Sequence, residues 1–122
     1  MKRITIIVFA FVFCSMLLHA QGKITTVHGE LVELTSFVKD GIKPTSVAGK
    51  EIATRSLGKG GALAILEKGT ARLYVVAPAS GDSTFLPRVT AYLGAKTFIK
   101  GHVTTRNGIR VITVEDIGKS LK

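Results

Sequence analysis

The stretch KTFIKGHVTTRNGIRVITV, residues 96–114, carries the clearest local folding signal of this chain. Residues 96–105 alternate apolar and polar side chains, as in a strand with one buried face. Asn107-Gly108 then supplies two residues that tolerate the positive φ angles of a type I′ turn. Residues 109–114 return with the same alternation. We therefore predict an antiparallel hairpin with strands at 96–105 and 109–114.

Two shorter apolar runs precede this hairpin, at residues 62–67 and 72–77. The turn between them, at Lys68-Gly69, is short, so we predict that these runs form a second antiparallel hairpin.

Two helices are also predicted. The first begins after a capping Ser46, runs to Leu57 and ends at the glycines that follow. The second begins at Ser83 or Thr84, since a proline at position 87 is tolerated in a first helical turn. Gly94 ends this helix.

Residues 23–37 are rich in β-branched side chains and predict a long first strand. The apolar side chains change face near Gly29, which indicates a bulge or a sharp bend. Residues 39–45 are predicted to form a loop, because Asp40-Gly41 and Pro44 are turn signals.

Five strands with a helix between the third and the fourth are the layout of the OB-fold, a small Greek-key barrel. We therefore predict a mainly β, five-stranded OB-fold-like barrel, with a short helix in the connection between strands one and two. An open sandwich of the same strands is the main alternative.

The first twenty residues have the layout of a secretory signal peptide: basic Lys2-Arg3, an apolar run over 4–18, and a small Ala20. That run is shorter than the roughly 20 residues of a membrane-spanning helix. We expect cleavage after Ala20 and a single exported domain at 21–122, periplasmic or secreted. Cys14 is the chain's one cysteine and follows a phenylalanine rather than the small residue of a lipoprotein signal. We therefore expect a soluble domain without a thiol or a disulfide.

Loss of Lys2 and Arg3 with this segment lowers the formal charge from +9 to +7. A basic small domain associates with polyanions, and export favours envelope components over nucleic acid. We expect a monomer without a cofactor, whose partner is an envelope protein or an anionic glycan or lipid. The simpler interpretation of the positive charge is a surface kept from self-association by like charge.

Four segments together resemble a family of small exported bacterial OB-fold-like proteins of uncharacterised function. They are GELVEL at 29–34, GGALAIL at 60–66, RLYVV at 72–76 and FIKGHVTTRNG at 98–108. The family pattern is a G-x-V-V-D-L strand, a loop and helix, G-x-x-x-G-I-L and (L/Y)-Y-L-L strands, and a final G-x-V-x-x-R-x-G hairpin. The resemblance implies the same barrel.

Relatives of this kind carry cysteines, and often a histidine, near the exit of the first strand and in the inserted helix. The matching positions here are Ser36, Ile52 and Ser56, with Gly49 near the histidine position. None of these side chains is a thiolate or an imidazole. The resemblance therefore implies that this chain keeps the scaffold without that cluster.

His28 and His102 are the histidines that remain after cleavage. The first and fourth strands pair in an OB barrel, so the two imidazoles are candidates to lie side by side. With Glu30 on the same face, they form a hypothetical transition-metal site. Two solvated histidines are the simpler interpretation.

Basic residues in the loops are the main candidates for ligand binding, with Tyr74 as an aromatic placed to stack a base or a sugar. The set is Lys39, Lys43, Lys50, Arg55, Lys59, Arg72, Tyr74, Arg106 and Arg110. The aromatic residues Phe85, Tyr92 and Phe98 are expected in the core. A single-strand nucleic-acid binder usually offers several stacking rings, and here Tyr74 is the one candidate. An exported nucleic-acid binder is therefore kept only as an alternative function.

Catalysis has little support in the sequence. No serine or cysteine is spaced with a base and an orienting group. Gly58 to Gly61 lacks the spacing of a phosphate-binding loop. We expect a non-enzymatic binding module, with a metal-handling or stress-related accessory protein as the alternative.

Overall fold

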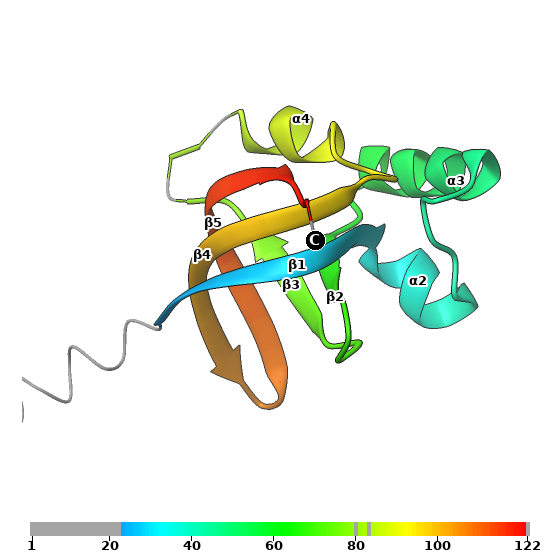
Figure 1. Cartoon of the computed structure of the whole chain (residues 1–122). Coiled ribbons are helices and arrows are strands. Elements are labelled where there is room, and N and C mark those ends of the chain that lie inside the picture. Colours follow the sequence, from blue (N-terminus) through cyan, green and yellow to red (C-terminus); the bar gives the residue numbers. More distant parts are fainter. Residues whose placement is uncertain (1–22, 80, 83, 122) are drawn as a thin grey trace, which may run out of the picture.

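The computed structural model describes residues 23–79, 81–82 and 84–121. The expected signal peptide, residues 1–20, lies outside the described residues. Within them, eight elements follow in chain order (Figure 1). They are β1 (Lys23–Glu33), α2 (Leu34–Asp40), α3 (Val47–Gly58), β2 (Leu63–Glu67), β3 (Leu73–Ala77), α4 (Phe85–Thr90), β4 (Lys96–Arg106) and β5 (Ile109–Lys119).

The five strands close into a barrel in the order β1-β2-β3-β5-β4. Neighbouring strands are antiparallel except β3 and β5, which run parallel. This is the OB-fold-like barrel that the element order predicts, and closure excludes the open sandwich. β1 provides the closure, since it pairs with β4 along residues 23–30 and with β2 along residues 29–33.

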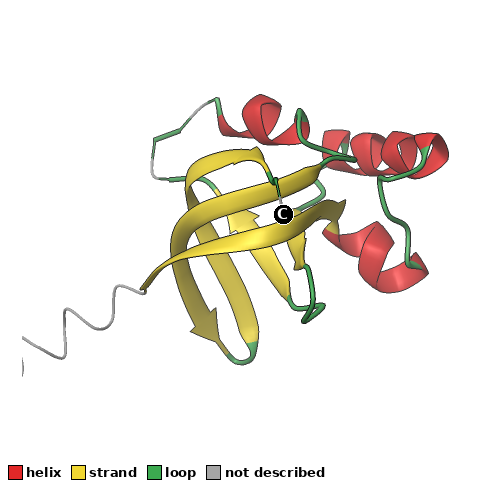
Figure 2. Ribbon diagram, viewed as in Figure 1, coloured by secondary structure: helices red, strands yellow, loops and turns green. Residues whose placement is uncertain are grey.

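The core fills the barrel and is completed by α4. Val27, Leu31, Ile65, Ile99 and Ile112 are fully buried inside it, and Phe85, Val89 and Leu93 join them from α4 and the turn after it. Figure 2 shows α4 above the barrel, at the end opposite the β2–β3 and β4–β5 turns. The turn end therefore has no covering helix.

Of the three aromatic residues expected in the core, one lies elsewhere. Phe85 is buried, and Tyr92 packs against the core from its edge. Phe98 lies on the outer face of β4, half-buried, because its neighbours Thr97 and Ile99 point inward. Its ring centroid is 6.2 Å from that of His28.

The first strand ends earlier than predicted. β1 stops at Glu33, and residues 34–40 form α2 instead of the end of a strand and the start of a loop. The buried Glu33 carboxylate accepts hydrogen bonds from the backbone N–H groups of Thr35 and Ser36, which caps the helix. Gly41 ends it with a left-handed backbone, φ 67°. These caps override the β-propensity of the segment.

The predicted cap and helix at α3 are confirmed, since the Ser46 hydroxyl accepts a hydrogen bond from the Gly49 N–H at 3.0 Å. Gly49 weakens the helix locally, yet the fold requires a glycine there. A Cβ at this position would lie 2.0 Å from the Lys43 carbonyl oxygen. The close approach brings the α2–α3 connection against the helix.

The final hairpin is longer than predicted, because β5 continues to Lys119 rather than ending at Val114. Gly101 pairs with Val114 and Lys100 pairs with Asp116, so Glu115 is an extra residue in β5. Such a bulge interrupts the alternation of buried and exposed side chains. The sequence pattern therefore breaks at 115–116 while the strand itself continues.

Candidate functional site

Three of the predicted basic residues lie at the uncovered end of the barrel, where the β2–β3 and β4–β5 turns project (Figure 1). Arg110 lies opposite Tyr74 in the parallel β3–β5 pairing. Arg106 pairs with Ile109 at the tip of the last hairpin, and Arg72 directly precedes β3. None of these arginines forms an ion pair within the described residues. We call Arg72, Arg106 and Arg110 the arginine end.

Tyr74 belongs to the core rather than to a stacking surface. Its side chain is 7% exposed and packs inside the barrel. The guanidinium carbon of Arg110 lies 6.0 Å from the centre of its ring, within reach of a cation–π contact. The expectation of a ring free to stack a base or a sugar is therefore wrong, because β3 turns this side chain inward.

The remaining predicted basic residues lie along the two helices between β1 and β2, away from the arginine end. They are Lys39 in α2, Lys43 in the connection, Lys50 and Arg55 in α3, and Lys59 after it. Arg55 is ion-paired with Glu51 at 3.6 Å, one helical turn away. The nine predicted ligand-binding residues thus do not form one continuous surface.

A groove of about 630 Å³ crosses the outer face of β1. Its walls are the β2–β3 turn, the α2–α3 connection, and the α4–β4 connection together with Ser120. Its ionisable lining is His28, Glu30, Lys43, Glu67, Lys68 and Lys96. We call it the β1 groove. A volume of this size falls within the roughly 300–1,000 Å³ of small-molecule sites.

The β1 groove contains charged side chains of both signs, and contacts within the protein hold its walls in place. Lys43 Nζ lies 3.3 Å from Glu30 Oε1, and both side chains stay partly exposed. The backbone N–H of Lys68 donates to the His28 carbonyl at 2.9 Å, which ties the β2–β3 turn to β1. The Glu67 carboxylate accepts a hydrogen bond from the Thr70 hydroxyl. The groove therefore has hydrogen-bond donors and acceptors in place among a lining that also includes glycines, alanines and Leu66.

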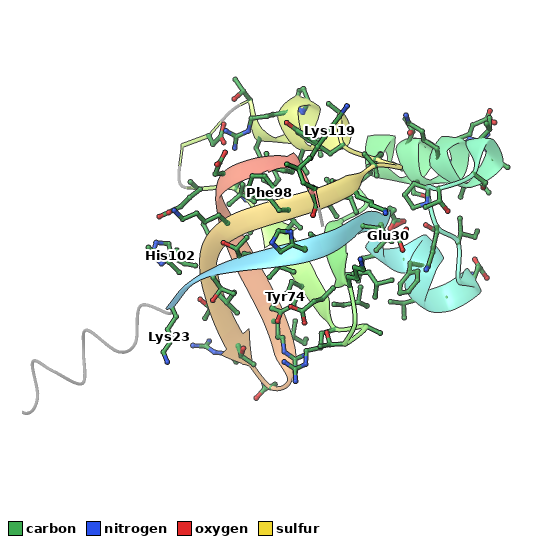
Figure 3. The ribbon with its side chains drawn as sticks, viewed as in Figure 1. Lys23, Glu30, Tyr74, Phe98, His102 and Lys119 are labelled. Atoms are coloured by element: carbon green, nitrogen blue, oxygen red, sulfur yellow. The ribbon has the colours of Figure 1, made fainter. Side chains whose placement is uncertain are left out.

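The two histidines expected to lie side by side are separated. β1 and β4 pair as expected, but His28 lies opposite Phe98 and His102 lies opposite Ile24. Figure 3 places His102 and Glu30 toward opposite ends of the β1–β4 pair. The hypothesis of adjacent imidazoles is wrong because the antiparallel register sets them four residues apart.

Each histidine has a hydrogen-bond partner of its own. His28 Nδ1 lies 2.8 Å from Ser120 Oγ, and His102 Nε2 lies 2.8 Å from Glu115 Oε1. In the described part of the chain, no three His, Cys, Asp or Glu side chains are grouped to hold a metal ion. The hypothetical set of His28, His102 and Glu30 therefore lacks ligand geometry.

The contact between Ser120 and His28 brings a hydroxyl and a possible base together. Acyl transfer by such a pair also needs a third group that orients the base. Among the described residues, His28 forms no ion pair with a carboxylate. The arrangement therefore offers hydrogen bonds to a ligand more readily than a nucleophile.

The lining residues of the β1 groove that sequence reasoning missed include Glu67, Lys68, Lys96 and Ser120. Lys68 reads only as a turn residue in the sequence, and Ser120 lies beyond the predicted last strand. Lys96 meets Glu30 across the β1–β4 pair. Only the strand register could have brought these residues together, since they come from three separate segments.

Comparisons of this chain with protein-family models, with curated proteins and with solved structures found no match. Over the residues that the structure describes, none of the helices has the length and apolar character needed to cross a membrane.

Proposed function

We propose that this chain is an exported, non-enzymatic OB-fold-like binding module that engages an anionic envelope component through the arginine end. The observation that carries the proposal is the location of Arg72, Arg106 and Arg110 at the same end of the barrel, on or beside two separate turns. A guanidinium offers a planar fork of donors that matches carboxylate, sulfate and phosphate groups. All three lack a carboxylate partner among the described residues and remain available for a ligand.

The position of these arginines supports binding rather than a merely solvated surface. The parallel β3–β5 pairing places Arg110 beside Tyr74, and the contact with the ring restrains its long side chain. A restrained arginine loses less conformational entropy when it binds an anion than a free lysine does. Lys39, Lys50 and Lys59 have no such contact among the described residues.

The structure gives less support to the two alternatives. A single-strand nucleic-acid site needs exposed rings on which bases stack, and Tyr74 is buried. Metal handling by His28 and His102 would need the two imidazoles together, and the register separates them.

The proposal is tested by binding to a model polyanion, dextran sulfate, over a series of salt concentrations. The triple variant Arg72→Gln, Arg106→Gln and Arg110→Gln should bind at least about tenfold more weakly, with a shallower salt dependence, because each ionic contact releases counterions. The proposal would be refuted if the control variant of the next paragraph weakened binding to dextran sulfate by the same factor.

The matched control removes the same charge from the helical side, as Lys39→Gln, Lys50→Gln and Lys59→Gln. All three lysines are exposed, so this variant should keep most of the binding. Thermal unfolding of both variants establishes that each is folded.

Export is tested separately, by mass spectrometry of the protein recovered from the producing cells. An N-terminus at Gln21 in the envelope or secreted fraction is the expected result. A full-length chain in the cytoplasm would contradict it.

A further inference from the structure

We infer that the β1 groove is a second binding site, whose ligand is a sugar unit of an acidic polysaccharide. This inference rests on the proposed function, because the same polymer would continue to the arginine end. The proposed function itself uses only the arginine end and does not involve the β1 groove.

The charged side chains of the groove, which are of both signs, limit the kinds of ligand that it can bind. Lys43, Lys68 and Lys96 attract negative charge, but Glu30 and Glu67 line the same space. A ligand that carries only negative charge, such as polyphosphate, would be repelled by these two carboxylates. The ligand must therefore be acidic and also donate hydrogen bonds to carboxylate oxygens.

An extended peptide could donate such bonds through its backbone, but the strand geometry disfavours it. At the floor of the groove, Gly29 pairs with both Thr97 and Glu67. Glu30 pairs in the same way with β2 and β4, so neither residue has a free strand edge for a further strand.

The lining also offers few large apolar side chains for those of a peptide to pack against. Glycines and alanines supply much of the remaining lining, and Leu66 is the large apolar side chain in it. Sugar hydroxyls, in contrast, need carboxylates, imidazoles and hydroxyls within hydrogen-bond reach. His28, Glu30, Thr45, Glu67 and Ser120 provide these groups.

The β2–β3 turn connects the two sites. Lys68 and Ala71 line the groove, and Arg72 begins the arginine end. Ala71 has φ 58°, a left-handed conformation that costs a non-glycine residue free energy. Strain of this kind concentrates at binding sites, and here it lies where a polymer would pass from one site to the other.

The test compares two polyanions with equal numbers of carboxylates, oligogalacturonate and poly-L-glutamate, by titration calorimetry at low salt. The protein should bind oligogalacturonate at least about tenfold more tightly, because only this polymer carries hydroxyls. Equal affinity for the two would overturn the sugar site and leave the proposed function standing. Failure to bind either polymer would overturn both.

Glu30→Ala gives effects of opposite sign on the two polymers. It removes an acceptor of sugar hydroxyls, so oligogalacturonate should bind about tenfold more weakly. It also removes one negative charge, so poly-L-glutamate should bind slightly more tightly.

Glu51→Ala is the control, because it removes the same single negative charge as Glu30→Ala, but from the exposed face of α3. It should slightly strengthen the binding of both polymers. Identical behaviour of the two variants would overturn the inference.

His28→Ala gives a second readout that does not depend on Glu30. It should weaken oligogalacturonate binding several-fold and leave poly-L-glutamate binding unchanged, with thermal unfolding as the check that the barrel is intact. Equal effects on both polymers would also count against a sugar site.

Discussion

Gly29→Ala should damage this barrel severely, although it adds only one methyl group. Gly29 is where β1 changes partner, since it pairs with Thr97 of β4 and with Glu67 of β2. An added Cβ would lie 1.9 Å from the Leu66 carbonyl oxygen and 2.8 Å from its carbonyl carbon. Both neighbours are backbone atoms, so no side-chain rotation relieves the overlap.

The magnitude follows from the backbone shift. Because Cβ contacts below 3.0 Å are essentially never observed, β1 and β2 must separate by about 1 Å at this point, which costs roughly 1–3 kcal/mol in strain. That separation also weakens about two ladder hydrogen bonds at about 1 kcal/mol each. The two contributions add to an expected loss of about 3–5 kcal/mol in the free energy of unfolding.

Urea unfolding followed by far-UV circular dichroism measures this loss, and no tryptophan is needed for the signal. With a denaturant slope of about 1–2 kcal/mol per molar, the midpoint should fall by about 2 M. The control is Gly58→Ala at the end of α3, where a Cβ meets nothing within 4 Å. Alanine favours helix over glycine, so this variant should be unchanged or more stable by up to about 1 kcal/mol. A Gly29→Ala midpoint equal to that of the wild type would refute the reasoning.

Three further substitutions test the turns and caps by the same urea assay. Ala71→Gly should raise the free energy of unfolding by about 0.5 kcal/mol, because relief of the φ 58° strain outweighs the added entropy of the unfolded chain; a loss of stability would contradict this. Glu33→Ala should cost about 2 kcal/mol, since it removes the buried cap of α2, and Glu51→Ala serves as its exposed comparison. Ser46→Ala should cost about 1 kcal/mol through loss of the bond from Gly49; a value near zero would show that this cap is dispensable.

Local signals in the sequence account for much of the architecture. The turn at Asn107-Gly108 and the cap at Ser46 act over a few residues, so they can be recognised without any knowledge of the rest of the fold. The order of these elements then indicates the barrel, because few topologies accommodate five strands with a helix after the third.

The candidate sites depended on contacts between distant residues. Whether His28 meets His102 is decided by the register of β1 against β4, and the inward turn of Tyr74 by the closure of the barrel. The bulge at Glu115 breaks the alternation of buried and exposed side chains, so the last part of β5 could not be recognised from the sequence. The position of Ser120 in the groove could not be predicted for the same reason.

The sequence by itself determined the elements whose signals lie within a turn or a cap, and through their order the OB-fold-like barrel. Only the tertiary structure decided which charges meet. The parallel β3–β5 pair places Arg110 opposite Tyr74, two residues after Arg72, and Glu30 faces Lys96 through β1 and β4. The physical reason is that strand pairing joins residues far apart in the chain, and a shift of one position would send each side chain to the opposite face.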